Sequence, residues 1–161
     1  MCKEIKMLEI NESIPSFELP ATQCGTLKSQ DLKGKYSVVY FYPKDNTPGC
    51  TTETTDFTNL YPEFQKLNCE VIGFNHNPMK SHEKFETKLG IPFPLVSDEE
   101  QKTVEEFGVW QLKKFMGREF MGIVRTTFVF DPEGKLIKRY DKVKVKEHAQ
   151  KVLEDLKELQ V

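Results

Sequence analysis

The chain has 161 residues, of which 38% are hydrophobic and 11% aromatic, so we expect one compact domain over residues 1–161 with a buried core. Basic and acidic residues nearly cancel to a net charge of -2, which argues against a nucleic-acid binder, because such proteins normally show a basic face. No apolar run reaches the roughly 18 residues of a transmembrane helix, and the N-terminus lacks the apolar segment of a secretory signal. We therefore expect a cytoplasmic protein that binds neither nucleic acid nor membrane.

The first half of the chain predicts short strands followed by one buried strand and a helix. Residues 14–32 are typical of short extended pieces, with Cys24-Gly25 as a hairpin turn. The apolar, β-branched run 37–42 predicts a buried central strand. Turn-forming residues occupy 43–49, and a helical apolar pattern follows. Pro62 lies inside that pattern, so we expect the helix to be kinked or split there.

The next segments predict a strand, a helix and a short second helix. A buried strand is expected over 70–74. Asn77-Pro78 predicts the cap and first turn of a helix that runs to Leu89. Residues 92–96 are expected to be extended. Ser97 or Asp98 then predicts the cap of a short helix that ends near Gly108.

The last third predicts a hairpin and a closing helix after a segment that looks flexible. Residues 110–122 show no clear pattern for either a helix or a strand. Strands are expected over 126–130 and 135–140, joined by a turn at 131–134. The final helix, 146–159, is predicted to bury one face that includes Leu159. Strands that alternate with helices indicate an α/β protein, with a central mixed sheet and helices on both of its faces.

Cys50 is the residue with the strongest claim to chemistry. It follows the turn after the 37–42 strand and falls in the first turn of the predicted helix. Sites in such sheets lie beyond the carboxyl ends of the strands. Unpaired N–H groups and the helix dipole at a helix start favour a negative charge, and the thiolate is the nucleophilic form of cysteine. The position therefore predicts a reactive thiol.

Three side chains are candidates to act with this thiol. Reduction of a peroxide requires hydrogen-bond donors for both oxygens, and the Thr47 hydroxyl is placed to serve one of them. Arg125, directly before the 126–130 strand, is the best candidate for a permanent cation beside the sulfur. Glu53 lies one helical turn after Cys50 and is a candidate to orient that arginine, although an ordinary first-turn acid is an equally good interpretation.

These residues form part of motifs that resemble those of the peroxiredoxins, and within them of the bacterioferritin comigratory protein, or Q-type, group. The Cys50 motif and the Arg125 segment are the specific ones, and the resemblance covers almost the whole chain. The matching segments are Phe17-Glu-Leu-Pro, Asp31-Leu-Lys-Gly-Lys, Tyr42-Pro-Lys-Asp-Asn-Thr-Pro-Gly-Cys50, Phe93-Pro-Leu-Val-Ser-Asp, Phe107-Gly-Val-Trp, Arg125-Thr-Thr-Phe and Asp131-Pro-Glu-Gly.

The resemblance implies a thioredoxin-like fold with an N-terminal β-hairpin, and a peroxidase for hydrogen peroxide and organic hydroperoxides. It implies that Cys50 becomes a sulfenic acid and that Pro43, Thr47 and Arg125 complete the pocket, with Gly49 and Glu53 in support. A thiol reductant is implied (thioredoxin, glutaredoxin or a small thiol), with no cofactor or metal. It also implies a monomer or weak homodimer.

The chain departs from the group's pattern in the cysteine that resolves the sulfenic acid. Many members carry that cysteine five residues after the reactive one, where this chain has Thr55. Others carry it in the following helix, near Glu86. We therefore expect either a one-cysteine cycle or an unusual route through one of the other three cysteines, which are Cys2, Cys24 and Cys69.

Two other functions compete with the peroxidase. A Cys-His hydrolase requires a general base near the thiol, and His76, His82 and His148 show no spacing that gives one a strong claim. Their spacing also fits no metal site. A redox sensor or binding module on the same fold shares Cys50 but lacks efficient turnover, so it differs from the peroxidase only in how many peroxide molecules each chain consumes.

Overall fold

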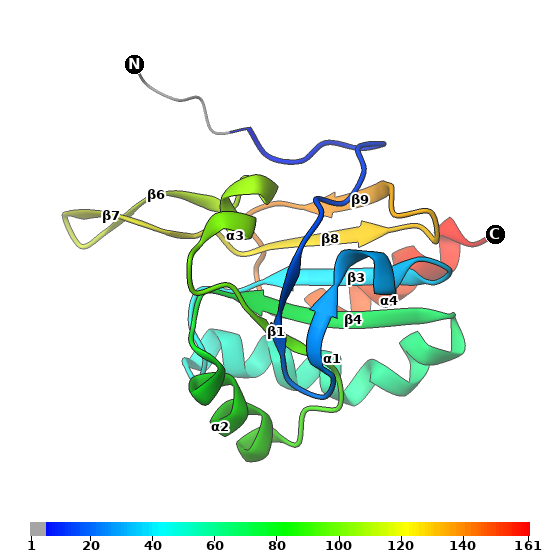
Figure 1. Ribbon diagram of the computed structural model, residues 1–161, viewed down its shortest axis with the longest axis horizontal. Coiled ribbons are helices and arrows are strands. Elements are labelled where there is room, and N and C mark those ends of the chain that lie inside the picture. The colour runs from blue at the N-terminus through cyan, green and yellow to red at the C-terminus, as the bar shows by residue number, and fades with distance from the viewer. Residues whose placement is uncertain (1–5) are drawn as a thin grey trace.

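A seven-stranded mixed sheet forms the centre of the computed structural model, which describes residues 6–161 (Figure 1). The strand order is β2-β1-β5-β4-β3-β8-β9, in which β5, β4 and β3 run parallel and the other neighbours pair antiparallel. The strands are β1 (Glu18–Ala21), β2 (Gly25–Lys28), β3 (Tyr36–Phe41), β4 (Cys69–Asn75), β5 (Leu95–Ser97), β8 (Thr126–Phe130) and β9 (Leu136–Tyr140). The mixed sheet and its N-terminal β1–β2 hairpin confirm the predicted fold class.

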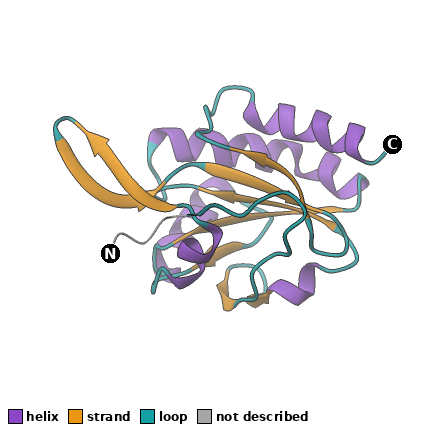
Figure 2. Ribbon diagram, turned by 90° about the horizontal axis from the view of Figure 1, so that it is seen from above, coloured by secondary structure: helices purple, strands orange, loops and turns teal. Residues whose placement is uncertain are grey.

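Four α-helices flank this sheet, and a separate hairpin extends away from it (Figure 2). The helices are α1 (Pro48–Lys66), α2 (Met79–Leu89), α3 (Lys102–Phe107) and α4 (His148–Leu159), with a 3-10 turn, η1, at Ser29–Leu32. The projecting hairpin consists of β6 (Trp110–Phe115) and β7 (Arg118–Ile123), which pair only with each other among the described residues.

Alternation along β3 builds a core on each face of the sheet. Tyr40 points to one face, where it stacks on Phe57 of α1, and the buried face of α4 completes that cluster. Phe41 points to the other face, where it packs against Phe107 of α3. Each large side chain buried in this way contributes roughly 1.5–3 kcal/mol. Helices therefore cover both faces, as the sequence predicts.

Two segments differ from what the sequence predicts. Helix α1 continues through Pro62 as one element, so the predicted split is absent, while the predicted kink stays a prediction. Pro62 is exposed while Tyr61 and Phe64 are buried, so the packing of its neighbours keeps the helix continuous. Residues 110–122 are not an irregular segment but the β6–β7 hairpin, which the sequence concealed because both of its faces are partly exposed.

Smaller differences concern helix ends. Asn77 does not cap α2, because its Oδ1 accepts the Asp45 N–H at 2.8 Å and Pro78 is the residue that precedes the helix. Gln101 precedes α3, although Asp98 still reaches the helix start by accepting the Val104 N–H at 2.8 Å. Leu159 is 40% exposed and lies outside the buried face of α4.

The sheet register brings the chemistry to one edge. Phe41, the last residue of β3, pairs with Thr126, the first residue of β8. The loop toward α1 and the residue before β8 therefore meet at the carboxyl end of β3, where α/β sheets carry their sites. Within residues 6–161, no helix has the length and apolar character needed to cross a bilayer.

Candidate active site

Cys50 is the third residue of α1, as the sequence predicts. The helix begins at Pro48, which has no N–H, and the Thr51 N–H donates to the Thr47 carbonyl at 2.8 Å. This leaves the N–H groups of Gly49 and Cys50 without helical acceptors at the positive end of the helix dipole. The Cys50 side chain is only 1% exposed and belongs to the core beneath α1.

Arg125 is the side chain that contacts the Cys50 sulfur. Its Nη2 donates to Cys50 Sγ at 3.3 Å. Arg125 lies between β7 and β8, and its carbonyl accepts the Val143 N–H at 3.1 Å, so its backbone is fixed on both sides. A charged hydrogen bond from a guanidinium stabilises a thiolate more than a thiol, because the donor carries a full positive charge.

Glu53 holds the other side of this guanidinium. Arg125 Nη1 donates to Glu53 Oε1 at 2.6 Å, and the Glu53 side chain is 1% exposed. Burial raises the pKa of Glu53 to about 7, although Arg125 works in the opposite direction. The second oxygen, Oε2, is buried and has no hydrogen-bond partner among the described residues. The carboxyl group therefore binds the arginine at one point and fixes its orientation toward Cys50.

Thr47, Pro43 and Gly49 belong to the segment between β3 and the first turn of α1, next to Cys50 in the chain. Thr47 Oγ1 donates to the Lys44 carbonyl at 3.0 Å, so its proton is engaged within the loop until another acceptor arrives. Pro43 is half-buried at the start of the same loop. A Cβ on Gly49 would lie 3.3 Å from Arg125 Nη2, so the missing side chain gives the guanidinium room to reach Cys50. The structure thus brings together Cys50, Arg125 and Glu53, with the Thr47 loop beside them.

Sequence reasoning missed several residues around this cluster. Tyr40 and Thr54 share a buried hydrogen bond of 2.9 Å beside Cys50, and the charge of Cys50 is among the causes that raise the pKa of Tyr40 after burial itself. Lys113 of β6 is half-buried, and burial followed by Arg125 lowers its pKa. Tyr40 looked like an ordinary strand residue and Lys113 like a surface lysine, so neither carried a signal in the sequence.

The other cysteines lie away from the site. Cys69 pairs with Tyr36 at the first residue of β3, whereas Cys50 follows the opposite end of that strand, about 16 Å along it. Cys24 is exposed in the turn after β1, and β1 is separated from β3 by two strands, which is about 14 Å. A disulfide requires Cα atoms within about 7 Å. Cys2 lies outside the described residues.

No histidine serves this thiol as a base. His82 Nδ1 bonds to Asp45 Oδ2, and His148 Nε2 bonds to Thr127 Oγ1. His76 packs edge-on to the Trp110 ring. Within residues 6–161, none of the three hydrogen-bonds to Cys50, and no group of three His, Cys, Asp or Glu side chains is arranged to hold a metal ion. The Cys-His hydrolase therefore lacks its general base.

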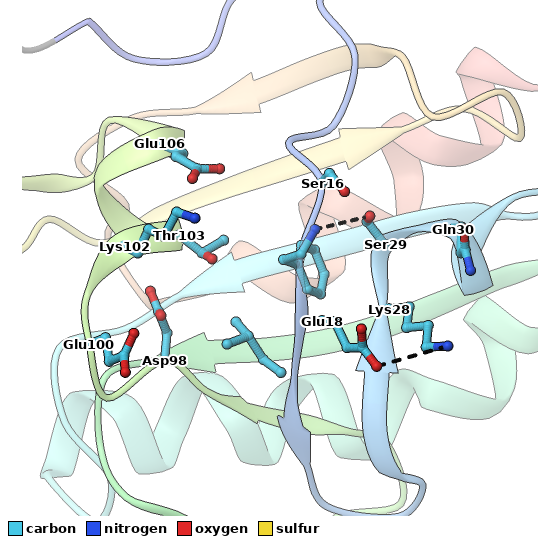
Figure 3. A pocket seen from close by; sticks show the side chains of 12 residues that line it. Ser16, Glu18, Lys28, Ser29, Gln30, Asp98, Glu100, Lys102, Thr103 and Glu106 are labelled. Carbon is cyan, nitrogen blue, oxygen red and sulfur yellow. Dashed lines mark hydrogen bonds and ion pairs between the residues drawn. The ribbon is translucent and has the colours of Figure 1, made fainter.

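A cavity of about 430 Å³ lies elsewhere, between β1, β2 and α3 (Figure 3). Its wall carries the ion pair between Glu18 and Lys28, whose charged atoms are 3.9 Å apart, and the carboxyl of Asp98. Neither Cys50 nor Arg125 lines it. This cavity is therefore separate from the thiol and its arginine.

A thiol at a helix start, bound by a partly buried arginine at the edge of a mixed α/β sheet, defines a thiol-dependent redox protein. The AhpC/TSA family matches residues 10–139. Peroxiredoxin Bcp of Bacillus subtilis is 47% identical over 152 residues, which cover 94% of this chain and 97% of that protein.

Solved structures agree with this match. The chain is similar to the Xanthomonas campestris bacterioferritin comigratory protein, with a TM-score of 0.85 and 39% identity over 90% of this chain and 92% of that one. It is also similar to Xylella fastidiosa PrxQ, solved as a cysteine-to-serine mutant, with a TM-score of 0.91 and 33% identity over 97% and 99% of the two chains.

The chain belongs to the AhpC/TSA family, as a peroxiredoxin of the Bcp or Q type. Its fold is thioredoxin-like, and it is a thiol-dependent peroxidase that uses a peroxide substrate and a thiol reductant.

Proposed function

We propose that Cys50 is the thiol that reduces the peroxide. The observation that carries this proposal is the 3.3 Å contact between Arg125 Nη2 and Cys50 Sγ at the start of α1. The thiolate attacks one peroxide oxygen, the O–O bond breaks, and the sulfur is oxidised to a sulfenic acid. The second oxygen leaves with the bonding electron pair and takes up a proton from the solvent. The product is water when the substrate is hydrogen peroxide, and an alcohol when it is an organic hydroperoxide.

Each neighbouring residue has a separate role in this step. Arg125 stabilises the thiolate and then the charge that spreads over the two oxygens. The Thr47 hydroxyl exchanges its bond to the Lys44 carbonyl for a bond to the peroxide. Glu53 orients Arg125, Gly49 leaves space for it, and Pro43 screens the sulfur from bulk water.

We further propose that the sulfenic acid is reduced by an external thiol in a one-cysteine cycle. An incoming thiol displaces water to form a mixed disulfide, and a second thiol then releases reduced Cys50. The positions of Cys24, in the turn after β1, and of Cys69, beside the first residue of β3, support this route. Thr55 and Glu86 occupy the places where relatives of this type carry a resolving cysteine.

The substrates proposed are hydrogen peroxide and organic hydroperoxides, and alkyl peroxide reduction is the activity named for the Xanthomonas campestris structure. Thioredoxin, glutaredoxin or a small thiol supplies the electrons. An exposed free thiol at Cys24 favours a reducing compartment, the cytosol. The expected assembly is a monomer or weak homodimer that binds neither nucleic acid nor membrane.

The test is a variant that retains Cys50 alone, with Cys2→Ser, Cys24→Ser and Cys69→Ala combined. Steady-state consumption of hydrogen peroxide with dithiothreitol, and separately with thioredoxin and its reductase, is compared with that of the unmodified chain. We expect turnover with at least one reductant within about threefold of the unmodified rate. A variant that consumes a single equivalent of peroxide and then stops would show that another cysteine resolves Cys50.

A further inference from the structure

A buried, hydrogen-bonded pair of side chains, Asp45 and His82, connects the loop that leads to Cys50 with a neighbouring helix. Asp45 belongs to this loop, between β3 and α1, and His82 belongs to α2. Asp45 Oδ2 and His82 Nδ1 are 2.6 Å apart, with the side chains 2% and 0% exposed. Neither residue contacts the sulfur, and the chemistry of the thiol makes no direct use of them.

Hydrogen bonds hold both members of this pair in place. His82 Nε2 lies 2.9 Å from the Val96 carbonyl oxygen, which only accepts, so this nitrogen carries a proton. Asp45 accepts from the hydroxyl groups of Tyr42 at 2.6 Å and Ser81 at 2.7 Å. Burial alone raises the pKa of Asp45, but His82 and these hydroxyl groups outweigh it and lower the pKa below its usual value. Because the oxygens of Asp45 accept from these two hydroxyl groups, we assign the donor role in the 2.6 Å contact to His82 Nδ1.

Further contacts connect the loop to the same helix. The Asp45 N–H donates to Asn77 Oδ1 at 2.8 Å, and Lys88 Nζ of α2 donates to Asn46 Oδ1 at 2.6 Å. The next residue is Thr47, whose carbonyl accepts the first helical hydrogen bond of α1. The loop directly before the helix start is thus attached to α2 through its side chains, and through its backbone to Asn77, two residues before α2.

We propose that Asp45 and His82 are positioning residues of the peroxidase, because the hydrogen bond between them holds residues 43–47 so that Thr47 and Cys50 are correctly placed relative to Arg125. The proposal rests on the function assigned to Cys50 above. Arg125, oriented by Glu53 of α1, reaches the sulfur from the β8 side, whereas Asp45 and His82 fix the loop from the α2 side. A displacement of about 1 Å in such a pocket costs roughly a hundredfold in rate.

The test compares two reactions of Cys50 in the variants Asp45→Asn and His82→Gln. Stopped-flow kinetics gives the rate constant for oxidation by hydrogen peroxide, which requires an aligned pocket. Alkylation by iodoacetamide at the same pH requires only a thiolate. We expect the peroxide rate to fall about 10- to 100-fold and the alkylation rate to stay within about threefold. Equal falls in both rates, or no fall in either, would overturn the proposal.

Two further variants control for stability. Tyr61→Phe removes a hydrogen bond of 2.7 Å to the Glu70 carboxylate in a distant part of α1, and should leave the ratio of the two rates unchanged. Ser81→Ala removes only the hydroxyl that donates to Asp45, and should lower the ratio of the peroxide rate to the alkylation rate about two- to fivefold. This milder variant tests the proposal if Asp45→Asn and His82→Gln fail to fold. If Cys50 of the unmodified chain did not react with peroxide, the function assigned to Cys50 would be contradicted. That result is distinct from a failure of the positioning proposal, which only the variants test.

Discussion

Cys50 and Cys69 are both buried thiols, 1% and 3% exposed, yet their surroundings are opposite. Cys50 lies at a helix start and accepts a hydrogen bond from Arg125. Cys69 opens β4, its sulfur donates to the Glu70 carbonyl at 3.4 Å, and burial followed by the Glu70 charge raises its pKa strongly. From this comparison we infer that burial by itself leaves Cys69 inert, and that the partly buried cation at a helix start is what makes the proposed nucleophile, Cys50, reactive.

The largest effect expected from this contrast is in the two cysteine replacements. Cys50→Ser should lower peroxide consumption at least about a thousandfold, because the nucleophile is lost. Cys69→Ala should leave the rate within about twofold and lower stability by about 1–2 kcal/mol. Peroxide consumption and thermal unfolding of both variants check this. Substantial activity in Cys50→Ser would mean that the wrong thiol has been assigned.

Removing the cation should make Cys50 resemble Cys69. Arg125→Met keeps most of the side-chain volume but loses the donor to the sulfur, so the rate constant for peroxide should fall about 100- to 1000-fold. The matched control is Arg139→Met, because Arg139 pairs with Asp141 and donates to the Leu8 carbonyl, not to Cys50. Stopped-flow oxidation of both variants gives the comparison, and a loss of similar size in both would show that the effect is not local to the sulfur.

A smaller effect is expected when the thiolate is kept and only the donor to the peroxide is removed. Thr47→Val retains the shape of the side chain but not its hydroxyl, so peroxide reduction should slow about 10- to 100-fold. Alkylation of Cys50 by iodoacetamide should stay within about threefold of the unmodified chain. If both reactions slowed together, Thr47 would act on the loop and not on the peroxide.

The smallest effect on rate, a few-fold, is expected for Glu53→Gln, which changes the pH dependence of stability instead. The pKa of Glu53 is raised to about 7, so the folded chain holds a proton that the unfolded chain releases near pH 4.5. Stability from this group is complete below pH 4.5 and falls as the pH rises to about 7, by on the order of 2–3 kcal/mol.

Glu53→Gln should remove that part of the pH dependence. Urea unfolding gives the free energy of unfolding of both proteins between pH 4.5 and 8. We expect the stability of the variant relative to the unmodified chain to increase as the pH rises. A constant difference across that range would mean that Glu53 is ionised throughout and that Arg125 outweighs its burial.

The sequence predicted the parts of this site that depend on local order along the chain. Cys50 falls at the helix start because a strand, a turn-rich loop and an apolar helical pattern follow one another, and Arg125 directly precedes a strong strand. The buried pair Asp45–His82 was not predicted, because a charged residue in a turn usually faces solvent and its partner lies 37 residues away. The β6–β7 hairpin was missed for a related reason, since its exposed apolar residues give no one-sided pattern.

The measurement that tests the central claim most directly is the intact mass of the reduced chain after one equivalent of hydrogen peroxide, with peptide mapping. We predict a gain of one oxygen, located on the Cys50 peptide, and its loss after addition of a small thiol. An oxygen on another residue, or no change in mass, would contradict the role of Cys50. Loss of two hydrogens with Cys50 joined to a second cysteine would retain that role and contradict the one-cysteine cycle.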